Sequence, residues 1–110
     1  MIDKIKESDW KYLNRLKPVL LERAFARINK EAALILKKGK DGEQRPVYHA
    51  MYKHYNREDE MIAECFDDYR RSMAKARILS LVRHGIMSDE ELEGFSEDTK
   101  EFVRFIIERE

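Results

Sequence analysis

Residues 56–85 have the sequence NREDEMIAECFDDYRRSMAKARILSLVRHG, and this stretch decides the fold that we predict. Six apolar or aromatic side chains fall on one side of a helix when successive residues are placed ~100° apart. They are Ile62, Cys65, Phe66, Tyr69, Met73 and Ala76. Asn56 suits an N-cap, and Gly85 suits the position just after a helix end. We therefore predict one long amphipathic helix over residues 56–85.

Two helical segments are predicted before residue 39. A short helix that begins at Ser8 should break at Pro18, because proline removes a backbone hydrogen bond inside a helix. A second helix is expected from Pro18 to Lys38, with Gly39 ending it. Its predicted apolar face is formed by Leu20, Leu21, Ala24, Phe25, Ile28, Ala32, Ile35 and Leu36.

Residues 38–46, KGKDGEQRP, are expected to form a loop. Glycine and proline favour a turn here, and neither flank shows the period-two pattern of a strand. Pro46 can open the next helix at its first position. Whether residues 46–84 form one helix or two is left open by the sequence.

The end of the long helix needs cover on every side. Ile78, Leu79, Leu81 and Val82 point in four directions on a helical wheel, and a helix that is apolar all round must be surrounded. We expect two short C-terminal helices, begun at Ser88 and Ser96, to pack over it, the first with a Ser88–Glu91 capping box. The predicted fold is all-α: a single-domain bundle of four to five helices over residues 1–110, built on one long central helix.

Composition restricts the class of protein. Charged residues make up 40% of the chain, with equal numbers of basic and acidic side chains. A single cysteine excludes an intrachain disulfide. The N-terminus does not resemble a signal peptide, and no apolar run reaches the ~18 residues that cross a bilayer. We therefore expect a cytoplasmic protein that does not interact with membranes.

Catalytic and metal sites are not expected from the residue spacing. His49 and His54 diverge on a helix, being five residues apart, whereas His54 and Glu58 share a face but are too few to hold a metal. A further acid, Glu64, completes no known metal motif. Cys65 lies on the apolar side beside acidic neighbours, which disfavour a reactive thiolate. The sequence predicts no catalytic residue, no cofactor, no metal and no enzyme.

Two rows of like charge suggest contact with a partner. The basic row comprises Arg23, Arg27, Lys30 and Lys37, and the acidic row comprises Glu60, Glu64, Asp67 and Asp68. Each row is expected to lie opposite the apolar face of its helix, so the two rows should not neutralise each other within one chain. They could do so between chains. The most favoured function is a non-catalytic helical protein that forms a homodimer or docks on another protein through helix faces.

Nucleic-acid binding is the alternative, using the basic, tyrosine-rich region of residues 23–57. Basic groups neutralise phosphates and tyrosines stack on bases. The residues concerned are Arg45, Tyr48, His49, Tyr52, Lys53 and Arg57. The C-terminal helix pair is not expected to act as a helix-turn-helix, because its last helix begins with several acids that would repel DNA.

The last helix has more apolar residues than one contact face requires. Phe102, Phe105 and Ile106 are expected to pack over residues 78–82 of the same chain. The other interpretation is a dimer contact through the same three side chains.

Overall fold

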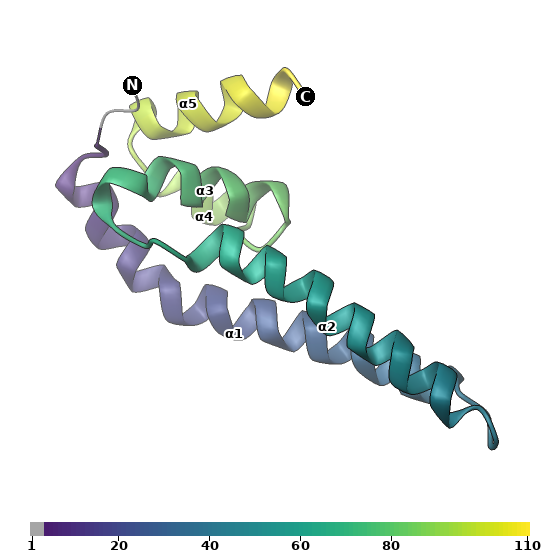
Figure 1. Cartoon of the computed structure of the whole chain (residues 1–110). Helices are drawn as coiled ribbons and strands as arrows, with labels where there is room; N and C mark the ends of the chain where they lie inside the picture. The colour runs from purple at the N-terminus through teal and green to yellow at the C-terminus, as the bar shows by residue number, and fades with distance from the viewer. Residues whose placement is uncertain (1–3) are drawn as a thin grey trace.

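The structure is a computed structural model that describes residues 4–110, and within that range all regular structure is helical. The elements are α1 (Glu7–Lys38), α2 (Gln44–Phe66), the 3-10 turn η1 (Arg71–Met73), α3 (Ala74–Arg83), α4 (Asp89–Glu93) and α5 (Glu97–Glu108). α1 and α2 run antiparallel, side by side, and the remaining helices gather at one end of this pair (Figure 1). The predicted all-α fold, with one long helix and short C-terminal helices packed over one end, is confirmed.

The long helix is α1, with 32 residues, and it runs through Pro18. The predicted break at Pro18 is therefore wrong. Pro18 and Asn14, whose carbonyl loses its helical hydrogen bond, are both exposed, so water can satisfy that carbonyl. On the opposite side of the same turns, Leu13 and Leu20 are completely buried. Their packing holds the helix straight enough to continue past the proline.

The predicted helix over residues 56–85 is interrupted. α2 begins at Gln44, so Asn56 lies inside it instead of capping it, and residues 46–84 form two α-helices. The chain turns after Phe66, where Asp68 adopts a left-handed φ of 50° that aspartate tolerates better than most residues. Tyr69 then stacks on Phe66 with ring centroids 6.3 Å apart. This turn places α3 against both α2 and α5.

The C-terminal helices surround α3, as its sequence requires. Ile78, Leu79 and Leu81 are all buried. α4 begins with the predicted capping box, in which Ser88 and Glu91 exchange side-chain and backbone hydrogen bonds. Ser96 precedes α5 as predicted, but its side chain does not cap that helix.

Asp9 of α1 binds the residues at the start of α5. Its carboxylate accepts hydrogen bonds from the Ser96 backbone N–H at 2.8 Å, the Ser96 hydroxyl at 2.6 Å and the Thr99 hydroxyl at 2.7 Å. Asp9 is only 3% exposed. Burial by itself would raise the pKa of Asp9, but the hydrogen bonds from Ser96 and Thr99 outweigh burial and lower it. The two ends of the chain are therefore joined by a buried, charged contact.

The molecule is elongated because half of the α1–α2 pair extends beyond the other helices. Its extents are 55 × 28 × 24 Å and its radius of gyration is 16.9 Å, against about 13 Å for a compact chain of this length. We call residues 25–58 the arm and the remaining helical part the head (Figure 1). None of the helices formed by residues 4–110 has an apolar stretch that could span a bilayer.

Candidate functional site

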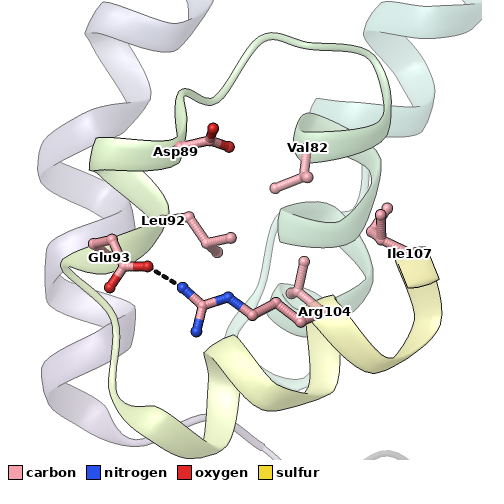
Figure 2. A pocket seen from close by; sticks show the side chains of 7 residues that line it. Val82, Asp89, Leu92, Glu93, Arg104 and Ile107 are labelled. Atoms are coloured by element: carbon pink, nitrogen blue, oxygen red, sulfur yellow. Dashed lines mark hydrogen bonds and ion pairs between the residues drawn. The ribbon is translucent and has the colours of Figure 1, made fainter.

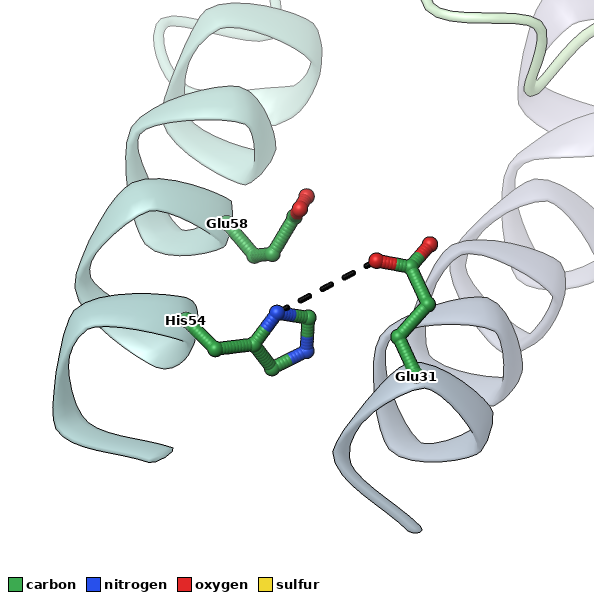
Figure 3. A group of neighbouring side chains, drawn as sticks. All are labelled: Glu31, His54 and Glu58. Atoms are coloured by element: carbon green, nitrogen blue, oxygen red, sulfur yellow. Dashed lines mark ion pairs between the residues drawn. The ribbon is translucent and has the colours of Figure 1, made fainter. Parts of the chain in front are cut away.

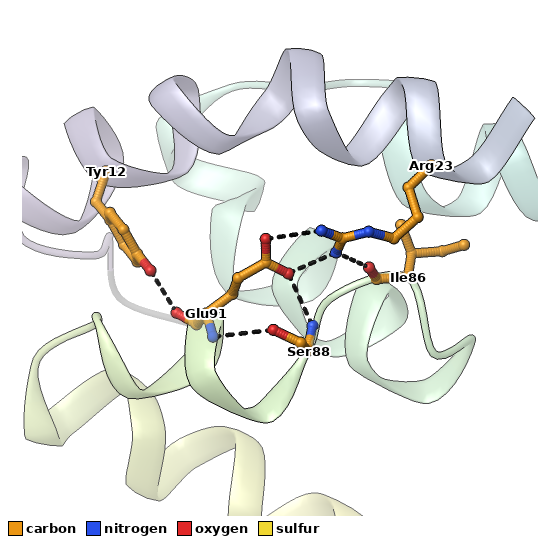
Figure 4. Close-up of polar contacts among 5 residues, drawn as sticks. All are labelled: Tyr12, Arg23, Ile86, Ser88 and Glu91. Carbon is orange, nitrogen blue, oxygen red and sulfur yellow. Dashed lines mark hydrogen bonds and ion pairs between the residues drawn. The ribbon is translucent and has the colours of Figure 1, made fainter. Parts of the chain in front are cut away.

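Arg23, the first member of the predicted basic row, makes its contacts within the same chain. Its guanidinium donates to the Glu91 carboxylate at 2.6 and 3.1 Å and to the Ile86 carbonyl at 2.6 Å (Figure 4). Tyr12 donates to the backbone carbonyl of Glu91 at 2.7 Å. The hydrogen bond from Arg23 is the largest cause that lowers the pKa of Glu91. Arg23 therefore fastens α4 to α1.

Arg27 also turns towards the head, and it lies near part of the acidic row. It donates to the His84 backbone carbonyl at 2.7 Å, and His84 Nε2 lies 2.7 Å from Glu64 Oε2. Arg27, Glu60 and Glu64 line one surface pocket of about 390 Å³. The antiparallel α1–α2 pair and the end of α3 bring Arg27 near Glu60 and Glu64, but no ion pair joins the two rows within residues 4–110. Whether the rows pair between chains stays a prediction.

The other members of the two rows remain at the surface. Lys30, Lys37 and Asp67 are exposed. Asp68 pairs with Arg70 at 2.8 Å, within its own turn. The use of these residues in binding a partner stays a prediction.

The six residues of the nucleic-acid alternative are all exposed on α2: Arg45, Tyr48, His49, Tyr52, Lys53 and Arg57. They do not converge on one patch. At ~100° per residue, Tyr48 and Arg57 point in opposite directions. Arg57 Nε also lies 4.0 Å from a carboxylate oxygen of Glu58.

One side of the arm carries uncovered aromatic side chains. Tyr48 is 69% exposed and Tyr52 is 61% exposed. Tyr55 lies on the same side of α2, and its hydroxyl donates to Asn29 Oδ1 of α1 at 3.0 Å, which shows that this side of α2 adjoins Asn29. We call this surface the tyrosine face; it comprises Phe25, Leu36, Tyr48, Tyr52 and Tyr55, all exposed.

Phe25 and Leu36 correct the predicted apolar face of the second helical segment. They were expected in the core but are 46% and 57% exposed. In the arm, α1 has only α2 as a neighbour, so only a narrow stripe of its surface is buried. Ile28 and Ala32 lie on that stripe and are buried. The wide apolar pattern predicted a broader contact than one helix provides.

A second cluster lies inside the arm between the two helices. Glu31 of α1 and both His54 and Glu58 of α2 place their ligand atoms within 4.8 Å of one another (Figure 3). The sequence predicted that His54 and Glu58 share a face, which gives only two possible metal ligands. Glu31, the third group, comes from the other helix, and no local spacing in the sequence reveals it.

Cys65 is completely buried, as predicted. Burial raises the pKa of the Cys65 thiol to about 11, and the charge of Glu64 adds to the rise. At neutral pH the thiol is therefore protonated and behaves as a small apolar side chain.

The head has an apolar pocket of about 370 Å³ between α3, α4 and α5. Val82, Leu92 and Ile107 line its apolar part (Figure 2). At its edge, Arg104 forms an ion pair with Glu93. Asp89 is the other charged residue that lines the pocket.

The last helix packs mainly within the chain. Phe102 and Ile106 are partly buried against the core. Phe105 is 56% exposed, and the Arg109 guanidinium lies over its ring, 4.0 Å from the centroid. Two of the three side chains therefore follow the preferred interpretation, and Phe105 does not.

Comparisons of the chain with protein-family models, with curated proteins and with solved structures found no match.

Proposed function

We propose that this is a non-catalytic interaction protein whose arm pairs with the arm of a second copy through the tyrosine face. The observation that supports the proposal is the exposure of Tyr48, Tyr52 and Leu36 on an arm that no other helix of the described chain covers. Large exposed apolar surfaces are typical of interaction sites. Tyrosine is also enriched in protein interfaces, because its ring is apolar and its hydroxyl is polar.

Pairing of two arms would complete a familiar architecture. A pair of helices buries only one stripe of each helix, whereas a four-helix bundle gives each helix two neighbours. Two copies related by a twofold axis would present the same face to each other. Antiparallel pairing of the two arms would place the tip of one arm beside the base of the other.

The charge along the arm favours this antiparallel arrangement. Residues 37–45, at the tip, contain four basic and two acidic side chains. Residues 57–64, the α2 side of the base, contain one basic and four acidic side chains, and the adjacent α1 residues 20–28 add two basic and one acidic, so the base is acidic overall. Tip-to-base pairing brings opposite charges together, whereas parallel pairing would bring like charges together.

The size of the face sets the expected affinity. With a rise of about 1.5 Å per residue, the uncovered part of each helix is roughly 20 Å long. The buried area would therefore lie below that of standard stable interfaces. We expect a reversible dimer with a dissociation constant in the micromolar range.

The test compares Tyr52→Glu with a control on the far side of the arm. Leu34→Glu is a suitable control, because Leu34 is 50% exposed and lies about 140° around α1 from Asn29. Sedimentation equilibrium should show that wild type and Leu34→Glu dimerise with similar constants. Tyr52→Glu should weaken dimerisation at least tenfold, since about 1.4 kcal/mol corresponds to that factor. Rising salt should weaken the wild-type dimer.

A monomeric wild type at millimolar concentration, or equal effects of the two variants, would contradict the proposed dimer. Circular dichroism should show unchanged helix content, because both side chains are exposed. If the wild type is monomeric but binds single-stranded DNA or RNA in low salt, and Tyr52→Glu abolishes this, the nucleic-acid alternative is favoured instead.

The proposal includes the expected cytoplasmic location. Cys65 is free and buried, and a chain with one buried thiol suits a reducing compartment. Fractionation of cells that produce the protein would test the location.

A further inference from the structure

The cluster inside the arm consists of one imidazole and two carboxylates from both helices (Figure 3). His54 is 2% exposed, while the side chains of Glu58 and Glu31 are 17% and 46% exposed. The cluster is therefore anchored in the interior by His54 and open to solvent on the side of Glu31. Glu58 also lines the surface pocket that Arg27 and Glu64 share, so the cluster adjoins the junction of the arm with the head.

The ring of His54 is held in a defined state. Its Nε2 lies 2.9 Å from the Ile28 backbone carbonyl. A carbonyl oxygen only accepts hydrogen bonds, so Nε2 carries a proton and donates it. In the neutral ring the other nitrogen, Nδ1, then has a free lone pair. Second ring N–H groups of metal-binding histidines are commonly held by a backbone carbonyl in this way.

The free nitrogen faces negative charge. Nδ1 lies 3.9 Å from Glu31 Oε2, beyond hydrogen-bond distance, and makes no hydrogen bond within residues 4–110. Glu58 presents its carboxylate to the same space (Figure 3). A lone pair that faces two carboxylates is electrostatically unfavourable unless a cation lies between them.

We propose that Glu31, His54 and Glu58 bind a divalent first-row transition metal, with Zn²⁺ as the preferred ion. An imidazole with two carboxylates is a ligand set that suits zinc, whereas magnesium and calcium prefer oxygen ligands alone. Three protein ligands leave a fourth tetrahedral position for water. Bound metal would join α1 to α2 in the arm.

The side chains can reach the required geometry. Tetrahedral zinc with bonds of about 2.0–2.2 Å needs ligand atoms roughly 3.3 Å apart, compared with the present limit of 4.8 Å. Glu31 is half exposed and can close this difference by rotation of its side chain. Arg57 competes for Glu58, with Nε 4.0 Å from a carboxylate oxygen, but its side chain is 69% exposed and can move aside.

The experiment titrates Zn²⁺ into metal-free protein and follows binding by calorimetry. We expect one zinc ion per chain in the wild type. Glu31→Gln and Glu58→Gln keep the size of each side chain but remove a ligand charge, and each should weaken binding at least about tenfold. Glu64→Gln is the matched control, because Glu64 lies beside a histidine at the surface without a third ligand.

NMR of the imidazole nitrogens gives a second readout that does not depend on the variants. Zinc should shift the Nδ1 resonance of His54 while Nε2 keeps its proton. The proposal is overturned if no zinc binds at about 100 µM, or if zinc binds equally to wild type, Glu31→Gln and Glu58→Gln. If Nδ1 instead carries a proton that it donates to Glu31, and zinc does not change its resonance, the cluster holds a proton in place of a metal and the proposal is also overturned. None of these outcomes depends on whether the protein dimerises.

Discussion

At the scale of single residues, Asp9 has the largest structural consequence. It is the second residue after the start of α1, yet its three hydrogen bonds are made to Ser96 and Thr99. Gly94 allows this region to approach α1, because a Cβ at that position would lie 2.3 Å from the Tyr12 ring. The N-terminal turn of α1 and the start of α5 therefore form one polar contact inside the head.

Replacement of Asp9 by alanine should lower the free energy of unfolding by about 2–3 kcal/mol at pH 7, because it leaves one buried and two partly buried donors without an acceptor. The pKa of Asp9 is lowered from its ordinary 3.8 in the folded protein. Its contribution is therefore complete above that value and is lost as pH falls through the folded pKa. Urea unfolding at pH 7 and pH 3 should show a smaller difference between variant and wild type at pH 3.

Asp41→Ala is the control for this prediction, because Asp41 is exposed in the loop between α1 and α2. It should change stability by no more than about 0.5 kcal/mol. A difference for Asp9→Ala that is equally large at both pH values would mean that lost packing, and not the carboxylate, is responsible.

At the scale of elements, α1 shows that packing overrides a local helix breaker. Pro18 costs one helical hydrogen bond and crowds the preceding turn. The buried residues on either side of it, Leu13 and Leu20, require a continuous helix to reach their contacts. The helix therefore retains a destabilising residue at an exposed position.

Pro18→Ala should stabilise the protein by about 2 kcal/mol, since alanine restores the hydrogen bond and the greater freedom of the unfolded chain offsets only part of the gain. Thermal unfolding followed by circular dichroism measures the effect. Asn14→Ala, one turn earlier and also exposed, should change stability by about 0.5 kcal/mol. Destabilisation by Pro18→Ala would show that α1 needs a bend at this position.

At the scale of the whole molecule, the arm and the head differ in what holds them together. The head packs five helical segments around buried residues such as Ile78, Leu81 and Val103. The arm has two helices joined by a loop at residues 39–43. Local opening costs less where few buried contacts are lost, so stability should fall along the arm towards its tip.

Hydrogen exchange should show this gradient. Backbone amides of residues 34–38 and 47–51 should exchange at least about tenfold faster than those of α3. Exchange measured by mass spectrometry on a dilute, metal-free sample tests the prediction. Equal protection of the two regions would mean that the arm is as stable as the head.

What the sequence by itself determined is the all-helical fold class and several of the helix ends. Apolar spacing, the Ser88–Glu91 capping box and the glycines at 39 and 85 act over three or four residues, so they can be read from the chain directly. The tertiary structure alone decided the passage of α1 through Pro18 and the turn at Asp68. It also decided that Phe25 is exposed and that Glu31 lies close to His54. These features depend on how α1 and α2 align and on which surfaces the head covers, and such contacts join residues far apart in the chain.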